Sequence, residues 1–312
     1  MALSAELLLT LQQIKGVGPK TIIKVAEDVG QAIKSIDDLC LYEYSKWIKK
    51  ITKDDLIEAH ENAVRIINNS KNQKVGLIGY YDDEYPESLK NTCDENGKLD
   101  PPILLWYRGD ISLLKKQGIA IIGTREATPD AIVAGQYIAK EFAKRGFNIV
   151  SGLAIGCDTC AHRGALDADG KTTAFLANGL DVNSIYPIEN QELAEEIVIR
   201  GGLLLSEYPI GAKVNRYALV ARDRLQAGLA MATVVVQTGI TGGTMHAANA
   251  TLKANKPLYA LKFKTEEANL HEKSLGNALL VERGAKYISG GDNIDSLCEK
   301  IIHESSIKTT LF

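Results

Sequence analysis

Residues 118–151 read GIAIIGTREATPDAIVAGQYIAKEFAKRGFNIVS, and they contain an apolar run, a polar loop, an amphipathic stretch and a second apolar run. The amphipathic stretch, Ala131 to Arg145, has apolar residues at three- and four-residue spacing, which predicts a helix. The runs Gly118 to Gly123 and Phe147 to Val150 are short and apolar throughout, which predicts buried strands. A strand, a covering helix and a further strand form the repeating unit of a parallel sheet.

The same alternation continues on both sides of this unit. Amphipathic stretches such as Glu189 to Arg200 and Thr244 to Ala254 separate further apolar runs in the second half of the chain. These runs are Val75 to Gly79, Ile103 to Tyr107, Thr172 to Leu176, Leu203 to Ser206, Thr233 to Gln237 and Pro257 to Leu261. The sequence therefore predicts a doubly wound parallel α/β sheet from about Val75 onward.

The N-terminal part has a different pattern. From Leu7 to about Asn69, apolar residues recur at helical spacing and no strand-like run interrupts them. The polar segment Asn68 to Lys74 then predicts a boundary. We expect a helical domain, an α/β domain and a flexible tail, at residues 1–72, 73–304 and 305–312.

One motif in the helical part is a candidate phosphate-binding element. Gly16, Val17 and Gly18 follow an apolar helix end, and Pro19 and Lys20 begin the next helix. This arrangement predicts a helix-hairpin-helix, in which Gly16, Gly18 and Lys20 offer backbone amides and a cation to a DNA phosphate. Such a contact carries no base information. An ordinary turn between two helices is the alternative interpretation.

Composition excludes several classes of protein. The chain has 312 residues, of which 45% are hydrophobic and 24% charged, so it is neither disordered nor a disulfide scaffold. No run approaches the roughly 18 apolar residues of a membrane span, and the first residues lack the pattern of a secretory signal. The five cysteines are scattered and odd in number, which is typical of a reducing compartment. We therefore expect a cytoplasmic protein without a membrane partner.

Charge is unevenly distributed, although the net charge is only −3. Residues 200–264 contain nine Lys and Arg but only two acids, Glu207 and Asp223, which leaves +7 in this segment. The excess favours an anion-binding face.

Ligands of doubly wound sheets bind beyond the carboxyl ends of the strands, so the loops that follow the predicted strands are candidate sites. Three of these loops are Gly123-Thr124-Arg125, Ser151-Gly152 and Gly242-Gly243-Thr244. Glycine lets a ligand approach the backbone, and arginine binds phosphate through two parallel hydrogen bonds. Arg222 and Arg224 would join them from the basic segment. Each loop taken alone is also explained as an ordinary glycine-containing turn between a strand and a helix. Together, the three loops favour a site for the phosphate of a nucleotide or nucleic acid.

A cysteine motif has two interpretations. Cys157 and Cys160 form a CxxC with His162 nearby, but zinc needs about four ligands and the chain has no second cysteine pair. Packing of two thiols at a buried helix start is favoured over a metal or redox site. The histidines are dispersed, and no nucleophile stands out beside a base. We expect neither metal nor cofactor.

The motifs from Tyr85 to about Leu261 resemble those of the DNA-processing protein A (DprA/Smf) family. The matching segments are Pro101-Pro102, Gly123-Thr124-Arg125, SGLA at 151–154, AHRGAL at 161–166, Gly179-Leu180-Asp181, SEYP at 206–209 and Arg222-Asp223-Arg224. The resemblance implies an extended Rossmann-like fold with a small N-terminal helical, SAM-like domain, and a homodimer. It also implies a protein without catalytic activity that protects single-stranded DNA and loads it onto a RecA-type recombinase in natural transformation.

The resemblance also implies a DNA-binding pocket. Its residues would be Gly123, Thr124, Arg125, Ser151, Gly152, Arg222 and Arg224, with Lys253 or Lys256 nearby. Two departures affect this pocket: Asp223 stands where the family usually has Asn, and Leu219-Val220 stands where it usually has Phe-Pro. A nucleotide sensor in a defence or signalling system remains an alternative. A nucleotide phosphoribohydrolase of the same superfamily is another, although residues 242–244 match its glycine-rich turn only in part.

Overall fold

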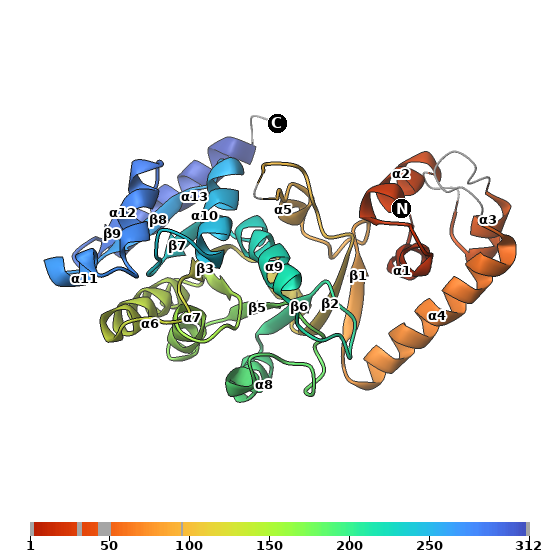
Figure 1. Ribbon diagram of the computed structural model, residues 1–312, viewed down its shortest axis with the longest axis horizontal. Coiled ribbons are helices and arrows are strands. Elements are labelled where there is room, and N and C mark those ends of the chain that lie inside the picture. Colours follow the sequence, from red (N-terminus) through yellow and green to blue (C-terminus); the bar gives the residue numbers. More distant parts are fainter. Residues whose placement is uncertain (1–2, 30–32, 43–50, 95, 310–312) are drawn as a thin grey trace.

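The structure is a computed structural model that describes residues 3–29, 33–42, 51–94 and 96–309. Its centre is one large sheet. The strands are β1 (Gly76–Gly79), β2 (Leu104–Gly109), β3 (Gly118–Ile122), β4 (Asn148–Ser151), β5 (Thr172–Leu176), β6 (Leu203–Ser206), β7 (Ala232–Val235), β8 (Leu258–Lys262) and β9 (Lys286–Ser289). In Figure 1 the sheet runs through an elongated molecule, from β1 beside the N-terminal helices to β9 at the other end.

The strand order is β1-β2-β6-β5-β4-β3-β7-β8-β9. From β6 to β9 in this order all neighbours are parallel, whereas β2 is antiparallel to both β1 and β6. The chain leaves β3 toward β4 on one side and later returns to β7 on the other side. The strand order therefore reverses between β3 and β7, and doubly wound folds bind ligands at such a point.

Helices cover both faces of the sheet. They are α5 (Glu87–Lys90), α6 (Pro129–Lys144), α7 (Cys157–Leu166), α8 (Gln191–Ile199), α9 (Arg216–Leu229), α10 (Gly243–Lys253), α11 (Glu266–Leu270), α12 (Leu275–Glu282) and α13 (Ile294–Thr309). Ile119 and Ile121 of β3 pack with α6, α7 and α13, whereas Ala120 and Ile122 pack with α9 and α10 on the opposite face. This alternation buries β3 on both sides, as the apolar run predicts.

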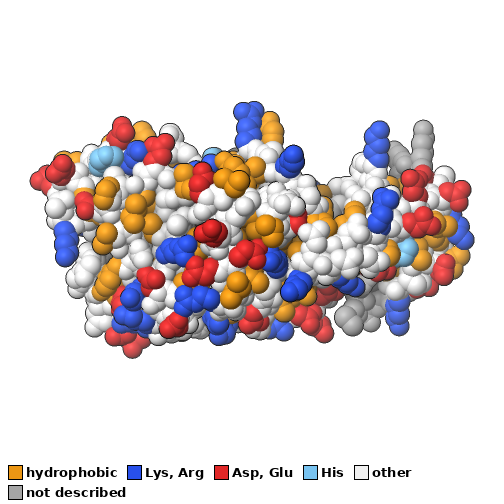
Figure 2. All heavy atoms as spheres, turned by 90° about the horizontal axis from the view of Figure 1, so that it is seen from below, with side chains coloured by type: hydrophobic (Ala, Val, Ile, Leu, Met, Phe, Trp, Pro, Cys, Tyr) orange, Lys and Arg blue, Asp and Glu red, His pale blue; other side chains and the backbone are white. Residues whose placement is uncertain are grey.

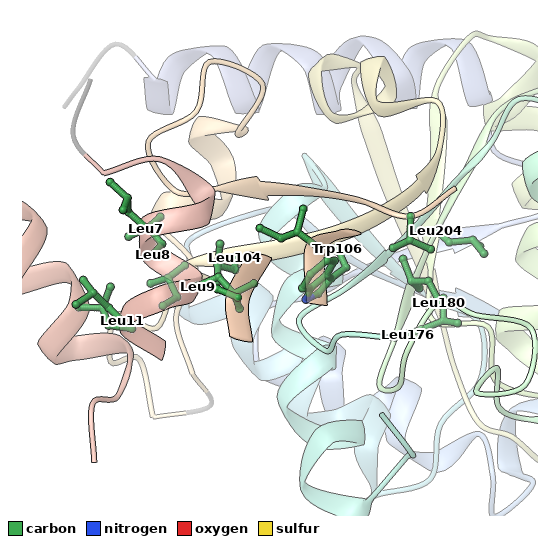
Figure 3. Close-up of a cluster of buried hydrophobic side chains, with 14 of the residues drawn as sticks. Leu7, Leu8, Leu9, Leu11, Leu104, Trp106, Leu176, Leu180 and Leu204 are labelled. Atoms are coloured by element: carbon green, nitrogen blue, oxygen red, sulfur yellow. The ribbon is translucent and has the colours of Figure 1, made fainter. Parts of the chain in front are cut away.

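The N-terminal helices are α1 (Ala5–Gln13), α2 (Pro19–Val29), α3 (Ile36–Leu41) and α4 (Lys53–Asn72). They share a hydrophobic core with the sheet. Leu7 and Leu11 of α1 belong to the same buried cluster as Leu104 and Trp106 of β2 and Leu204 of β6 (Figure 3). Removing the N-terminal helices would therefore expose apolar side chains of the sheet.

The predicted α/β fold is confirmed, with differences in detail. The prediction missed β9, because only Ile288 of this edge strand is buried and no apolar run marks it. The helical pattern was expected to end at about Asn69, but α4 continues to Asn72. The predicted tail from Ser305 is helical through Thr309, and residues 310–312 lie outside the described residues.

Candidate functional site

A pocket of about 390 Å³ opens at the carboxyl edge of the sheet, beside the ends of β3 and β7. Four segments line it: the loop after β3, the start of α7, the first half of α9, and the loop from β7 into α10. The pocket therefore lies where the strand order reverses. Residues from the separate loops at 123–125 and 242–244 meet here, as the sequence predicts.

Backbone contacts hold the loop after β3 against the start of α7. The amide of Thr124 donates to the carbonyl oxygen of Gln237 at 2.8 Å, and the amide of Cys157 donates to that of Thr124 at 3.1 Å. Gly156 has φ +79°, and a Cβ there would lie 2.5 Å from the carbonyl oxygens of Thr124 and Arg125. Only glycine fits this close approach. Cys157 is completely buried and packs beneath the loop, consistent with the packing interpretation of the CxxC motif.

Arg222 lies at the bottom of the pocket between two carboxylates, Asp158 and Asp223. Its Nη1 donates to the carbonyl oxygen of Gly152, and its Nη2 donates to Oδ1 of Asp223 at 3.0 Å. A Cβ on Gly152 would lie 2.6 Å from the guanidinium carbon and 2.7 Å from Oδ2 of Asp158. Arg222 is therefore already neutralised by buried protein groups, and it is not a free cation for a phosphate.

Burial raises the pKa of both Asp158 and Asp223, and the positive charge of Arg222 opposes this shift in each case. His246 on α10 also lowers the pKa of Asp223. Oδ2 of Asp223 lies beside the start of α10, 3.2 Å from the position of a Cβ on Gly243. A carboxylate thus stands next to a helix N-terminus, where the partial positive charge of the helix favours an anion.

Two exposed arginines, Arg125 and Arg216, line the mouth of the pocket. Arg125 makes no ion pair with any residue in the described ranges. The guanidinium of Arg216 lies 5.2 Å from the ring centre of Tyr217, which is 74% exposed. Neither Arg216 nor Tyr217 was among the site residues predicted from sequence, although Arg216 is one of the nine basic residues in the segment 200–264.

Arg224 does not lie in the pocket, contrary to expectation. Its guanidinium donates to both carboxylate oxygens of Glu207 at 2.8 Å and pairs with Asp100 at 2.7 Å. Arg222 and Arg224 are two residues apart on one helix, so their side chains point to nearly opposite sides. Arg224 therefore joins α9 to neighbouring loops.

Three further predicted residues lie elsewhere. Lys256 is half-buried, and its Nζ donates to the carbonyl oxygens of residues 227, 228 and 230 at the end of α9. Lys253 ends α10, at the opposite end of that helix from the pocket. Ser151 is completely buried, and its hydroxyl donates to the carbonyl oxygen of Ile121. These side chains are unable to reach a ligand in the pocket.

The predicted hairpin joins α1 to α2. Gly16 has φ +84°, and the space around Gly16 and Gly18 is open. Lys20 is exposed and lies against Lys98, and this contact lowers its pKa. The hairpin therefore presents backbone and a lysine pair to solvent, separate from the pocket.

On the face shown in Figure 2, the described side chains form no patch of a single charge sign. The face in Figure 2 shows basic and acidic side chains close together, and three arginines of the fold, Arg108, Arg163 and Arg200, pair with carboxylates. Over the part of the chain that the structure describes, no three side chains of His, Cys, Asp or Glu converge to hold a metal ion. None of the described helices combines the length and apolar composition needed to cross a membrane.

The sequence and fold match known proteins. The family model of DNA recombination-mediator protein A matches residues 76–300. The DNA processing protein DprA of Bacillus subtilis is 30% identical over 244 residues, covering 78% of this chain and 77% of the relative. Protein Smf of Synechocystis is 30% identical over 287 residues, covering 90% of this chain and 69% of the relative.

Two solved structures have the same fold. DNA processing protein A from Streptococcus pneumoniae superimposes with a TM-score of 0.74 at 25% identity, over 93% of this chain and 96% of that chain. The protein of the same name from Helicobacter pylori has a TM-score of 0.61 at 30% identity, over 74% of this chain and 97% of that chain. The latter structure gives insight into how that protein binds single-stranded DNA.

Proposed function

The chain belongs to the family of DNA recombination-mediator protein A, and we propose that it binds single-stranded DNA at the pocket on the carboxyl edge of its sheet. The observation that carries the proposal is the pair of exposed arginines, Arg125 and Arg216, at the mouth of the pocket. Their guanidinium groups are the donors that best match phosphate. Arginines at the mouth bind the phosphates of the DNA backbone, so the affinity should fall as the salt concentration rises.

Two neighbouring features support the same ligand. The helix α10 begins at Gly243, and its N-cap Gly242 has no side chain to bond the first amides, which start at the pocket beside Asp223. Tyr217 is highly exposed beside Arg216 and offers an aromatic face on which an unpaired base can stack. Stacking requires a base that is free of its partner strand, which favours single-stranded over double-stranded DNA.

Fluorescence anisotropy with labelled oligo(dT) and a duplex of equal length tests this function. We expect the full chain to bind oligo(dT) at low salt and to bind the duplex more weakly. Tyr217→Ala should weaken oligo(dT) binding by about fivefold or more, because base stacking on an aromatic side chain contributes about 1 to 3 kcal/mol. Equal binding to both DNAs, or stabilisation of the protein by a mononucleotide without any DNA binding, would contradict the proposal.

We extend the proposal to recombination. In this proposal the protein acts without catalysis and delivers bound single-stranded DNA to a RecA-type recombinase. The name of the family, DNA recombination-mediator protein A, supports a role in recombination. The test adds the chain to single-stranded DNA covered by a single-strand binding protein and then measures how fast recombinase filaments nucleate. Faster nucleation supports mediation, and an unchanged rate limits the function to DNA binding.

We also propose a homodimer. An apolar groove of about 630 Å³ lies between α6 and the ends of β8 and β9, and Val133 beside it is 70% exposed. Asp130 and Lys264 line the same groove, so a two-fold axis can pair each acid with the base of the other copy. Sedimentation should show a dimer for the native chain and a monomer for Val133→Lys.

The helical part has an auxiliary role in this proposal. Gly16, Gly18 and Lys20 of the hairpin contact phosphates of a strand whose main contacts lie on the α/β domain, residues 73–304. Deleting residues 1–72 would expose the shared core, so a point substitution is the better test. Lys20→Glu should weaken binding of long oligonucleotides by a few fold and leave binding of short ones unchanged.

A further inference from the structure

The bottom of the pocket is poorly suited to a phosphate, although its mouth is suited to one. Two carboxylates, Asp158 and Asp223, line the bottom, and the single guanidinium between them already donates to protein groups. A phosphate carries acceptors and negative charge only. It would meet two like charges there, and the Nε of Arg222, which has no hydrogen-bond partner among the described residues, is enclosed by protein.

One acceptor at the bottom remains available. Asp223 is 8% exposed, and its Oδ1 accepts from Arg222 and from Nε2 of Gln226. Its Oδ2 accepts no hydrogen bond from any described residue, yet it is not enclosed, so it keeps surface open to the pocket. A nearly buried carboxylate oxygen with such free capacity is matched by an N–H donor of a ligand.

The walls between mouth and bottom are apolar. Leu219 and Val220 of α9, with Ala154 and Ala247 opposite, line the pocket beside its polar groups. Arg216 and Asp223 are seven residues apart on α9, so they lie on one face of the helix roughly 10 Å apart. One nucleotide can therefore place its phosphate at the mouth, its flat base between the apolar walls and the base edge at Asp223.

We propose that Asp223 is a specificity-determining residue that accepts a hydrogen bond from the exocyclic amine of a nucleobase. The inference rests on the proposed DNA binding and deepens it. The site selects bases that carry an exocyclic amine, and it discriminates against bases with a carbonyl group at that position.

The test compares oligo(dC) with oligo(dU) of equal length, bound to the full chain at pH 7.5. Cytosine carries an exocyclic amine at the position where uracil carries a carbonyl group. The sugar-phosphate backbones of the two DNAs are the same. We expect oligo(dC) to bind at least about fivefold more tightly than oligo(dU). The amine of cytosine donates a hydrogen bond to the charged carboxylate, whereas the carbonyl oxygen of uracil is repelled by it. Asp223→Asn should bring this ratio close to one.

A matched control is Asp181→Asn. Asp181 is another nearly buried carboxylate, held by the amide of Gly211 and the hydroxyl of Ser184 outside the pocket. Its substitution should leave the ratio unchanged. Equal binding of the two DNAs by the native chain overturns the inference without any variant, and so does a ratio that survives Asp223→Asn. Failure of the native chain to bind either DNA overturns the proposed function itself.

Discussion

Arg222 donates from Nη2 to the carboxylate of its sequence neighbour Asp223 at 3.0 Å, and both residues are 8% exposed beneath the pocket. Adjacent residues on a helix seldom pair, because their side chains diverge. Here the carbonyl oxygen of Gly152 holds the other side of the guanidinium and turns it toward Asp223. The floor of the pocket is therefore a fixed network, and the free cations lie at its mouth.

Asp223→Asn should tighten the binding of oligo(dT) by about fivefold, because it removes a negative charge that opposes the DNA backbone in a partly desolvated site. Thymine has no exocyclic amine, so it loses no favourable contact in this variant. A binding titration at constant salt measures the change. Weaker binding by the folded variant would show that the carboxylate contributes favourably even to thymine.

Arg222→Ala should destabilise the protein by about 3 to 5 kcal/mol, because it leaves the buried carboxylates of Asp158 and Asp223 without their counter-charge. Urea denaturation measures this free energy of unfolding. If the variant is as stable as the native chain but fails to bind DNA, then Arg222 contacts the DNA directly.

Lys256→Met should lower the free energy of unfolding by about 3 kcal/mol, because three carbonyl groups at the end of α9 lose their donor. Burial lowers the pKa of Lys256 to about 8, which agrees with a structural role. The control is Lys116→Met, at another exposed lysine, with a change below about 0.5 kcal/mol. Loss of DNA affinity in Lys256→Met at unchanged stability would return this lysine to the binding site.

His162 should make stability depend on pH. Burial lowers its pKa to about 3, and its Nδ1 lies 2.7 Å from the hydroxyl of Thr172. The unfolded chain binds a proton near pH 6.5 while the folded chain stays neutral, so this group destabilises the fold as pH falls below 6.5. Its contribution at pH 5 is about 2 kcal/mol relative to pH 7.5.

His162→Gln removes this contribution. The stability difference between the native chain and the variant should therefore shrink by about 2 kcal/mol on going from pH 7.5 to pH 5. The raised pKa values of Asp158 and Asp223 act in the opposite direction, but both proteins contain these groups, so their effect cancels in the comparison. A difference that stays the same at both pH values would mean that His162 is charged when folded.

The strands and the position of the pocket could be predicted from sequence for a simple reason. Parallel strands buried on both faces leave apolar runs, and the loops at their carboxyl ends are fixed by chain direction. Thr172 to Leu176 and Leu203 to Ser206 were predicted with the bounds that the structure has. An edge strand such as β9 has little buried surface and leaves no comparable pattern.

The roles of the arginines were harder to predict, because they depend on partners far away in the sequence. Glu207 and Asp100 neutralise Arg224, and no local pattern reveals such pairs. Helical geometry could have corrected part of the prediction. Once residues 216–229 are taken as a helix, Arg216 and Asp223 share one face and Arg224 lies on another. That reasoning would have selected Arg216.

The central claim is that Arg125 and Arg216 bind DNA phosphates at the mouth of the pocket. The most direct test is a salt titration of oligo(dT) binding by the native chain, by the double variant Arg125→Ala with Arg216→Ala, and by Arg145→Ala. Arg145 ends α6 at the opposite edge of the sheet, where it pairs with Glu141 and Asp295.

Each phosphate contact with single-stranded DNA contributes about 0.7 to the slope of log K against log salt. We expect the slope of the double variant to be shallower by about 1.4, whereas Arg145→Ala keeps the native slope. A double variant that is folded and retains the native slope would contradict the role of Arg125 and Arg216, because the phosphates would then be bound elsewhere on the protein.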